Sequence, residues 1–543
     1  MKNIVVDTDY IQSGDFWDSD GFLKYWLHKH LPASILEHIK PNLAFIGQKS
    51  AREMNHLSML VDKFPPQHVK RNFWGETIDD IMFHPAYWQL QQIALDAGLF
   101  SLKWDPEKKN TVRGYEHRIG FGVGFIYAMS EMGQYCPHCM TDGAARLLDR
   151  YAPTKTKSRL LPNIYAKSND NFFSGAMFLT EKSGGSDVGA NLVTATHVSE
   201  NTYLLNGEKW FCSNANAEIA FVLARTNKNI PGTKGLSLFL VEKINADGSR
   251  NHKELVRIKE KLGVRSMASG EYIFQNTRAT LIGAEFQGFI LMTDMINLSR
   301  LYNAVAAIAC GRRAIIEAYQ YVKSRKTFGK NLISNALIQD KLLELNALWQ
   351  QDFLLTFAAI EALDKADAGG SKEAEALARL LIPMAKRTTA QHVVYITREC
   401  MELFGGMGYI EDGIIPRLHR DALVLPIWEG SGNIILLDML RAVMKSSCLQ
   451  HLQNHLREIN STNSAIDTAL QEVQRLQELA AEAAQIPAKK AFESLTTAYQ
   501  HILLSENQHH PAIQATLEYK NTRNVSQEIV EKAIDWQLPD NIA

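Results

Sequence analysis

Long apolar runs, an excess of charge of one sign and a cysteine framework are all missing from this chain. No stretch reaches ~18 uninterrupted apolar residues, so no membrane-spanning helix is expected. The formal net charge is only −1, which gives no polycationic signature for nucleic acid. The start of the chain has no basic segment followed by an apolar run, so no signal peptide is expected. Six cysteines in 543 residues do not make a disulfide framework, and a reducing, cytoplasmic setting is the default expectation.

Apolar residues make up 46% of the chain, which is enough for a large core and more than one domain. Their spacing is helical at first, although Pro32 and Pro41 interrupt it. Over residues 172–289 the pattern becomes strand-like, and Asn206-Gly207 predicts a hairpin turn between two short strands. Helical spacing then resumes. An order of helices, strands and helices argues against a doubly wound α/β domain and favours an α+β fold.

The same changes of pattern suggest five segments. They are an N-terminal extension, an N-terminal helical domain, a β domain, a C-terminal helical bundle and a helical C-terminal extension. Their predicted bounds are residues 1–65, 66–171, 172–289, 290–445 and 446–543.

Two short motifs look functional but fit ordinary structure better. Cys136 and Cys139, in CPHC, have the spacing of a redox pair, but a helical run precedes them where such a site needs a strand. No second Cys/His pair stands at ligand spacing, so no metal site is expected. The glycines of IGFGVGF, residues 119–125, follow no strand and the third comes one place early for a dinucleotide fingerprint, which favours close helix packing.

Five other motifs combine small, aromatic and charged residues in ways that suit a ligand. Each one alone also fits a turn, a core strand or a helix end. The fifth motif raises a further question, because it places one carboxylate, Glu429, in apolar sequence without a neighbouring Lys or Arg. The motifs are TEKSGGSD (180–187), GEKWFCSN (207–214), SRKTFG (324–329), ELFGGMGYIED (402–412) and LPIWEGSGNI (425–434).

Taken together, in this order and at this spacing, the five motifs resemble those of the acyl-CoA dehydrogenase family. The similarity spans about residues 80–445. The segments outside that range, and Trp428 where most members have Tyr, resemble the family's AidB branch. The resemblance implies a helical N-terminal domain, a middle antiparallel β domain and a C-terminal four-helix bundle with an extra helical tail, and FAD bound between them.

The resemblance also assigns residues to the cofactor. Thr180, with the backbone of Phe178 and Leu179, should meet the pyrimidine side of the flavin. Phe211 should stack by the isoalloxazine, and Ser213 should reach the N5 region. The other residues that match cofactor contacts are Gly185 and Ser186 at the pyrophosphate, and Arg325, Phe328, Gly405, Gly406, Trp428, Ser431 and Asn433.

Four of these, Arg325, Phe328, Gly405 and Gly406, match residues that hold FAD from a neighbouring subunit. An oligomer is therefore implied, and the family is usually a homotetramer. Acyl-CoA would be the substrate and an electron-transfer flavoprotein the electron acceptor.

Glu429 matches the family's catalytic base. A carboxylate in an apolar pocket loses solvation, which would make it a stronger base for the α-proton of a thioester. Its backbone N–H, with a flavin hydroxyl, would polarise the thioester carbonyl. Arg300 matches an arginine near the base and could supply the positive charge that the sequence around Glu429 lacks.

Two other functions stay open. The larger Trp428 could fill the acyl pocket, which would leave an acyl-CoA-sequestering flavoprotein with little turnover. The AidB branch also suggests double-stranded DNA binding through the C-terminal extension, where Arg441 matches an arginine implicated in DNA contact. From Arg441 onward, however, the chain has more acidic than basic residues, so DNA is disfavoured as a partner.

Overall fold

The computed structural model describes residues 14–370, 372–459 and 463–537. Spatial proximity divides the chain into two compact units, and each unit is made from several stretches. Unit one comprises Met1–Asn55, Thr111–Ser130 and Asn303–Ala543. Unit two comprises His56–Asn110 and Glu131–Tyr302. The five segments expected from the sequence stay a prediction, because they follow the pattern of the residues and not their proximity in space.

Unit one begins with helices whose first turns are capped by aspartates. In α1 (Phe16–Ser19) and α2 (Gly21–His30), the carboxylates of Asp15 and Asp20 accept hydrogen bonds from backbone N–H groups of the first turn, which have no partner inside the helix. Pro32 precedes α3 (Ala33–Ala51), as the sequence predicts. Pro41 lies inside α3, so the expected break at Pro41 is wrong.

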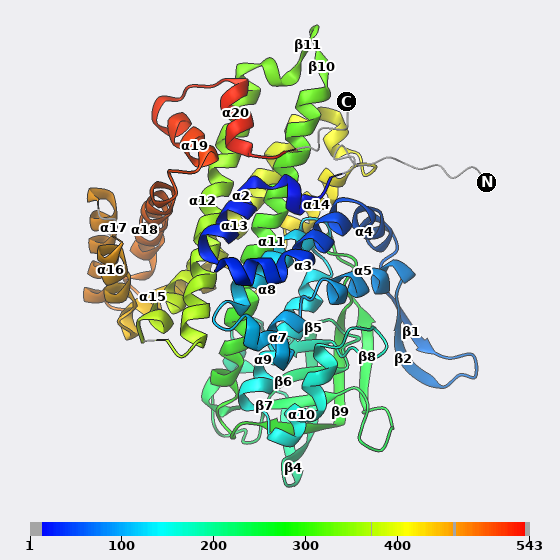
Figure 1. The fold of residues 1–543 in the computed structure, drawn as a ribbon. Coiled ribbons are helices and arrows are strands. Elements are labelled where there is room, and N and C mark those ends of the chain that lie inside the picture. The colour runs from blue at the N-terminus through cyan, green and yellow to red at the C-terminus, as the bar shows by residue number, and fades with distance from the viewer. Residues whose placement is uncertain (1–13, 371, 460–462, 538–543) are drawn as a thin grey trace, which may run out of the picture. The chain divides into compact units, whose positions relative to one another are not determined.

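Long helices make up the middle of unit one. Helices α12 and α13 pack along one another (Figure 1), and α8 packs against α12. The indole Nε1 of Trp349 donates to the carbonyl of Ile308 at 2.8 Å, which satisfies the polar atom of a fully buried ring. The helices are α8 (Glu116–Ala128), α11 (Gly288–Ser324, which starts in unit two), α12 (Ala336–Asp367), α13 (Lys372–Leu403), α14 (Ile414–Ala422) and α15 (Gly432–Lys445).

The C-terminal extension is helical and returns to the start of the chain. Gln537 donates its N–H to the carbonyl of Ser19 at 2.9 Å, and Asp20 forms a β-bridge with Trp536. The buried Arg312 of α11 bonds the carboxylate of Asp20 at 3.0 Å. The extension's helices are α16 (Cys448–Glu458), α17 (Ser464–Arg475), α18 (Gln485–Glu506), α19 (Pro511–Thr522) and α20 (Gln527–Ile534).

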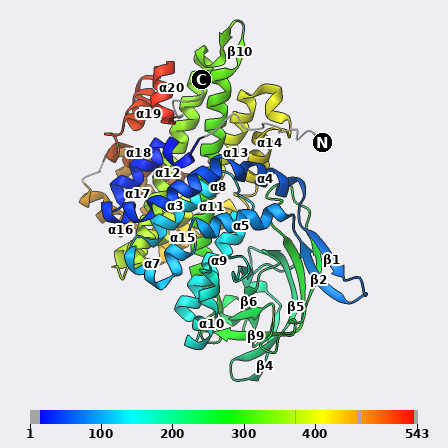
Figure 2. The same cartoon turned by 45° about the vertical axis from the view of Figure 1, so that its right-hand side comes forward.

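Unit two combines helices with a hairpin and a large sheet (Figure 2). The antiparallel hairpin β1 (Gln67–Arg71) and β2 (Thr77–Met82) lies within residues 66–171, the segment expected to be helical, and adds two strands to it. Helix α9 packs against β3, where Gly175 leaves no room for a side chain beside Ala144. The helices are α4 (Glu53–Lys63, which starts in unit one), α5 (Pro85–Asp96), α6 (Ser101–Trp104), α7 (Pro106–Thr111), α9 (Tyr135–Tyr151) and α10 (Thr154–Ile164).

The sheet has the strand order β3-β6-β4-β5-β9-β7, with β8 on β9 and a further pairing of β6 with β7. Most pairings are antiparallel, as expected, but β3 and β4 each pair with β6 in parallel. The strands are β3 (Gly175–Phe178), β4 (Thr194–Ser199), β5 (Thr202–Ser213), β6 (Ile219–Arg225), β7 (Leu236–Glu242), β8 (Lys253–Ile258) and β9 (Ser269–Ile282).

The hairpin predicted at Asn206-Gly207 is wrong. Strand β5 runs straight through both residues and pairs with β4 on one side and β9 on the other. The register against β9 shifts between Leu205 and Asn206, where Asn276 of β9 is the extra residue, so the pair lies opposite a bulge in β9 and not in a turn. Asn206 bonds the side chain of Asn276 at 3.1 Å and accepts the N–H of Asn276, which stabilises the bulge.

The fold class and the helical placement of two sequence motifs are confirmed. The helical, β and helical order matches the α+β fold class. CPHC lies at the start of α9, with Cys136 half-buried and Cys139 buried, and IGFGVGF lies within the buried helix α8. In the described part of the chain, no helix has the length and apolarity to cross a membrane. Nor does that part contain a group of His, Cys, Asp or Glu side chains suited to a metal ion.

Candidate functional site

In unit two, the loop after β3 is fixed by a buried ion pair. The Lys209 Nζ donates to Glu181 Oε1 at 2.7 Å and to the Leu179 carbonyl at 3.2 Å. The Lys209 side chain is fully buried and that of Glu181 is 5% exposed. Burial lowers the pKa of Lys209, while the adjacent carboxylate opposes that shift. The pair therefore holds the start of the Thr180–Asp187 loop against β5.

The loop itself presents small residues to open space. A side chain at Gly184, where φ is 143°, would meet nothing within 4 Å. A side chain at Gly185 would press on Thr180, whose Oγ1 would be 3.1 Å from the added carbon. Ser186 is exposed. This loop can therefore admit an anion close to its backbone, as the sequence predicts for a phosphate.

Strand β5 bulges where its aromatic residues stand. The register against β9 shifts between Lys209 and Cys212, so Trp210 and Phe211 have no direct partner there. The backbone N–H of Trp210 instead donates to the carbonyl of Thr180 at 2.8 Å, which joins the bulge to the loop. Phe211 has φ of 52°, a conformation that bulky residues adopt only under constraint. Its ring is 56% exposed and available for stacking.

Ser213 lies two residues beyond Phe211 and is also accessible. Its hydroxyl oxygen is 3.3 Å from that of Ser269 on β9, and the two residues are paired in the sheet. Between them in the strand, Cys212 is buried, and burial raises its pKa to about 12, so the thiol stays neutral. The bulge thus presents a ring and a hydroxyl, and Cys212 adds no charge.

The hydrogen bonds of Leu179 limit which of its atoms could contact the predicted cofactor. Its carbonyl accepts from both Lys209 and the Asn191 side chain, the latter at 2.9 Å. Two donors use both lone pairs of that oxygen. Phe178 is buried, with its ring 5.7 Å from that of Tyr272. A cofactor contact at Leu179 therefore has to come from an atom other than the carbonyl oxygen.

In unit one, Glu429 lies in a tight turn between α14 and α15. Its φ is 56°, and the following Gly430 has φ of 101°. The buried Lys386 of α13 donates to the Gly430 carbonyl at 2.7 Å, and Asn303 donates to the Leu425 carbonyl at 3.2 Å. Trp428 and Glu429 are both half-exposed. The turn is therefore anchored to α13 and α11, and it holds the backbone of Glu429 in a strained conformation.

Helix α15 begins directly after this turn. Ser431 is its N-cap residue, but the Ser431 side chain makes no capping hydrogen bond. Ser431 and Asn433 are both exposed. The first turn of α15 also carries a partial positive charge and N–H groups with no partner inside the helix. This end of α15 therefore suits a polar or anionic ligand group.

Arg325 and Phe328 lie at the end of α11, where a two-residue hairpin joins β10 (Lys326–Thr327) to β11 (Lys330–Asn331). Phe328 has φ of 50° and Gly329 has φ of 77°, the signs that a type I′ turn requires. The Phe328 ring is fully exposed. A rigid turn with a fully exposed ring is typical of a contact with another molecule.

Gly405 and Gly406 begin the short helix η4 (Gly405–Tyr409), which follows α13. A side chain at either position would meet nothing within 4 Å. Just before them, the ring of Phe404 stacks on that of Tyr321 in α11, with centroids 4.3 Å apart. The glycines thus lie on a surface fixed by α11 and α13, with their backbone open to a ligand.

Arg300 belongs to unit two, whereas Glu429 belongs to unit one. Arg300 is 7% exposed, and one of its NH groups is 3.4 Å from the side-chain oxygen of Asn297. The proposed relation between Arg300 and Glu429 stays a prediction.

Sequence reasoning missed three residues that position the predicted ones. Lys209 and Glu181 lie within or beside quoted motifs, but as charged residues in strand and loop they resemble surface positions. Lys386 lies on α13, outside every motif. Only the fold shows that all three are buried, that Lys209 donates to the Glu181 carboxylate and that Lys386 donates to the Gly430 carbonyl.

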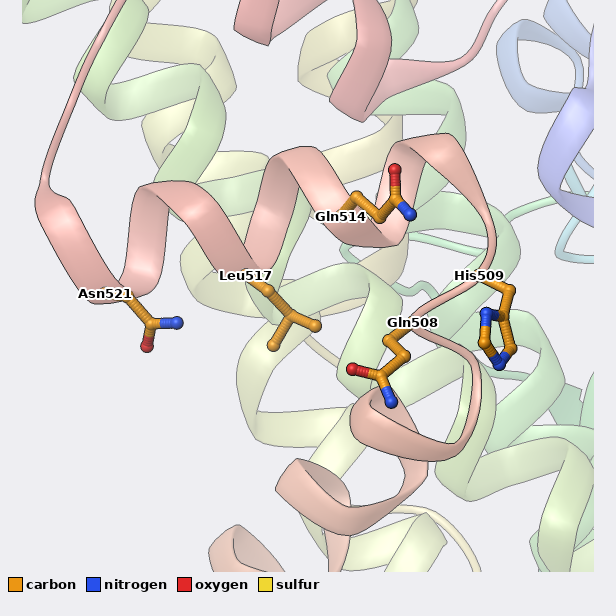
Figure 3. A pocket seen from close by; sticks show the side chains of 5 residues that line it. All are labelled: Gln508, His509, Gln514, Leu517 and Asn521. Carbon is orange, nitrogen blue, oxygen red and sulfur yellow. The ribbon is translucent and has the colours of Figure 1, made fainter.

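A surface depression is formed by the turn between α18 and α19 and by α19 itself (Figure 3). Its lining is mostly polar, and none of the predicted site residues contributes to it. It is lined by Gln508, His509, Gln514, Leu517 and Asn521.

Three family models match consecutive parts of the chain. Residues 8–171 match the adaptive response protein AidB N-terminal domain. Residues 176–277 match the acyl-CoA dehydrogenase middle domain, and residues 287–444 match the acyl-CoA dehydrogenase C-terminal domain.

Two curated proteins are similar over most of the chain. Acyl-CoA dehydrogenase family member 11 of Caenorhabditis elegans is 30% identical over 85% of this chain and 78% of its own. Putative acyl-CoA dehydrogenase AidB of Escherichia coli (strain K12) is 33% identical over 80% of both chains.

The structure of C. elegans ACDH-11 in complex with C11-CoA has a TM-score of 0.86 and 26% identity. The match spans 97% of this chain and 93% of the ACDH-11 chain.

Proposed function

Because this chain belongs to the acyl-CoA dehydrogenase family, in its AidB-like branch, we propose that it oxidises an acyl-CoA thioester to the 2,3-enoyl thioester with Glu429 as the base. Family membership makes it an FAD-dependent oxidoreductase. The identity of the base, the order of proton and hydride removal and the acyl chain are parts of the proposal.

The residues of unit two fit a flavin. The exposed ring of Phe211 and the hydroxyl of Ser213 come from one bulged strand, and the Thr180 loop is bonded to that strand. The open space at Gly184 and the exposed Ser186 suit the pyrophosphate. We propose that these residues, with Phe178, Leu179 and Gly185, bind FAD. When bound, FAD accepts the β-hydrogen of the substrate as a hydride.

The assignment of Glu429 is carried by its place in the LPIWEGSGNI motif together with its backbone conformation. A glutamate with φ of 56° is held there only when its surroundings determine the turn, and such strain concentrates at functional sites. The Lys386 bond to Gly430 and the start of α15 at Gly432 provide that constraint. The Glu429 carboxylate would take the α-proton of the substrate, and its N–H would polarise the thioester carbonyl. Arg300 would add positive charge near the base.

Trp428, Ser431 and Asn433 surround the base in the sequence and would contact cofactor or substrate. Ser431 and Asn433 are exposed at the start of α15, where the helix dipole favours anionic groups. The half-exposed Trp428 would limit the space for the acyl chain. In this proposal, the Trp428 indole therefore sets how long an acyl chain the substrate can have.

We extend the proposal to a homotetramer in which a second copy completes the cofactor site. Phe328 is fully exposed, and Arg325 is exposed near it. A side chain at Gly405 or Gly406 would meet nothing within 4 Å, so the backbone there is also open to another molecule. In the acyl-CoA dehydrogenase family such residues contact FAD of a neighbouring subunit. An electron-transfer flavoprotein would then reoxidise the flavin.

Anaerobic titration with acyl-CoAs of graded length tests the activity. The wild-type flavin should bleach with at least one of them. Glu429→Gln should lower the rate of bleaching by about 10²–10⁴-fold, the usual contribution of a positioned base, while FAD stays bound. Bleaching at the wild-type rate in Glu429→Gln would refute the base assignment, and no bleaching with any acyl-CoA would refute the activity.

Acyl-CoA sequestration with little turnover is the second candidate. It is favoured by the similarity to ACDH-11, whose structure contains C11-CoA, and by the bulk of Trp428. Tight binding of acyl-CoA in the same titration, without flavin bleaching, would select this function over oxidation.

A further inference from the structure

Beside the proposed flavin ring site, a lysine fills the corner between two aromatic side chains. Lys259 follows β8, and its N–H donates to the Ser269 carbonyl at 2.8 Å. Its Nζ lies 3.7 Å from the ring centroid of Trp210 and 4.4 Å from that of Phe211. The two rings are nearly perpendicular, at 79°, with centroids 5.5 Å apart. One ammonium therefore contacts both aromatic residues of the β5 bulge.

A carboxylate behind Lys259 binds its side-chain nitrogen. Glu271 on β9 bonds the Lys259 Nζ at 2.5 Å, and both side chains are about nine-tenths buried, at 11% and 10% exposure. The hydrogen bond from Arg257 is the largest effect and lowers the pKa of Glu271 to about 2; burial opposes it, and the hydrogen bond from Lys259 lowers the pKa further. The carboxylate is therefore ionised at neutral pH, and the ammonium remains paired and fixed.

The bulge needs such a contact, because its own backbone does not favour the observed conformation. Phe211 has a positive φ, and neither Trp210 nor Phe211 has a partner on β9. The backbone N–H of Trp210 bonds Thr180, which fixes Trp210. Phe211, however, is 56% exposed, so its ring has few packing neighbours to select its rotamer. A cation against its face provides that selection.

We propose that Lys259 is a positioning residue that holds the Phe211 ring ready for the isoalloxazine and places a fixed positive charge beside the flavin. This rests on the proposed function, since it takes the Phe211 ring as the flavin contact. The charge acts through the ring and takes no part in proton transfer. Its expected consequences are tighter FAD binding and a higher midpoint potential, because a nearby cation favours the extra negative charge of the reduced flavin.

The test compares full-length variants at Lys259 with one at its neighbour. Lys259→Met removes the charge but keeps the chain length, and Lys259→Arg keeps both charge and ring contact. The matched control is Arg257→Met. It removes the other cation that bonds Glu271, while the cation against the Trp210 and Phe211 rings, Lys259, stays in place. FAD affinity is measured by titrating apoprotein, and the midpoint potential is measured on the holoenzyme.

We expect Lys259→Met to weaken FAD binding by about five- to tenfold, the range of a partly desolvated cation–π contact, and to lower the midpoint potential. Lys259→Arg and Arg257→Met should both stay within about twofold of wild type. An unchanged affinity and potential in Lys259→Met would overturn the inference. So would equal losses in Lys259→Met and Arg257→Met, because these would reflect only the charge balance at Glu271.

Two safeguards separate this test from others. If Lys259→Met does not fold, Lys259→Gln removes the charge while keeping a donor for Glu271, and the same outcomes apply. If wild-type protein binds no FAD at all, the proposed function fails. If it binds FAD and the Lys259 variants do not differ from it, only the role of Lys259 fails.

Discussion

The buried pair Lys209–Glu181 should be the most sensitive point of the flavin half-site. Lys209→Met removes a fully buried ammonium that bonds Glu181 at 2.7 Å and the Leu179 carbonyl at 3.2 Å. It leaves a carboxylate that is 5% exposed. That carboxylate still accepts hydrogen bonds from the backbone N–H groups of Leu192 and Val193. An unpaired buried charge therefore remains.

Breaking a buried ion pair by removing one partner costs about 3–5 kcal/mol, and the two remaining N–H donors place this case near the lower end. For a unit of 150–250 residues, about 3 kcal/mol lowers the melting temperature by roughly 6–12 °C. FAD affinity should fall as well, because the Thr180–Asp187 loop loses its anchor to β5. Calorimetry of the apoprotein and FAD titration measure the two effects separately.

A control and a rescue variant make the test specific. Lys182→Met removes an exposed pair with Glu208, at 2.6 Å, from the same loop and strand. Exposed pairs contribute about 0–1 kcal/mol, so its melting temperature should hardly change. Glu181→Leu combined with Lys209→Met removes both charges and should recover part of the stability. If Lys209→Met shifted the melting temperature no more than Lys182→Met, the reasoning would be refuted.

Three further predictions concern other parts of the chain. Trp428→Tyr, which restores the residue most common in the family, should speed flavin bleaching with longer acyl-CoAs in the same titration; unchanged rates at every length would show that the indole does not limit the acyl chain. His138 is buried, and burial lowers its pKa to about 3 from 6.5, so only the unfolded state gains a proton as the pH falls below 6.5. Stability should fall by about 1.4 kcal/mol per pH unit between those values, and His138→Gln should flatten that slope in acid denaturation; an equal slope would contradict the account. Double-stranded DNA should not bind at low salt, and a binding curve that weakens steeply with added salt would contradict this.

The sequence predicts most of the fold class, because helical and strand periodicities switch clearly near residues 172 and 289. Its errors come from signals that tertiary pairing overrides. Asn206-Gly207 is a strong hairpin signal, yet β4 and β9 flank β5 on both sides, so the chain continues as a strand opposite a bulge in β9. Pro41 lies within α3 for a similar reason, since Ile39 and Leu43 on either side of it are buried and packing stabilises the helix through it.

The motifs predict which residues form the candidate site, but not the contacts that fix their backbone. Thr180, Phe211 and Glu429 can be identified from local sequence. Lys386 cannot, because it lies more than a motif's length from Gly430 and is joined to it only by the packing of α13. Lys259 is equally distant in sequence from the rings that it contacts. Long-range partners of this kind leave no periodic signal in the chain.

The backbone at the motif centres joins these two kinds of information. Phe211, Phe328 and Glu429 all have positive φ, although an aromatic or a glutamate gains nothing from that conformation by itself. Each is constrained by a neighbour: the Trp210 bond to Thr180, the paired strands β10 and β11, and the Lys386 bond to Gly430. Val264 and Phe286 also have positive φ outside the motifs, so strain alone does not mark a site. The ring of Phe286 is exposed as well, so the three are distinguished by their place in the quoted motifs, where the surrounding anchors hold an accessible ring or carboxylate ready for a ligand.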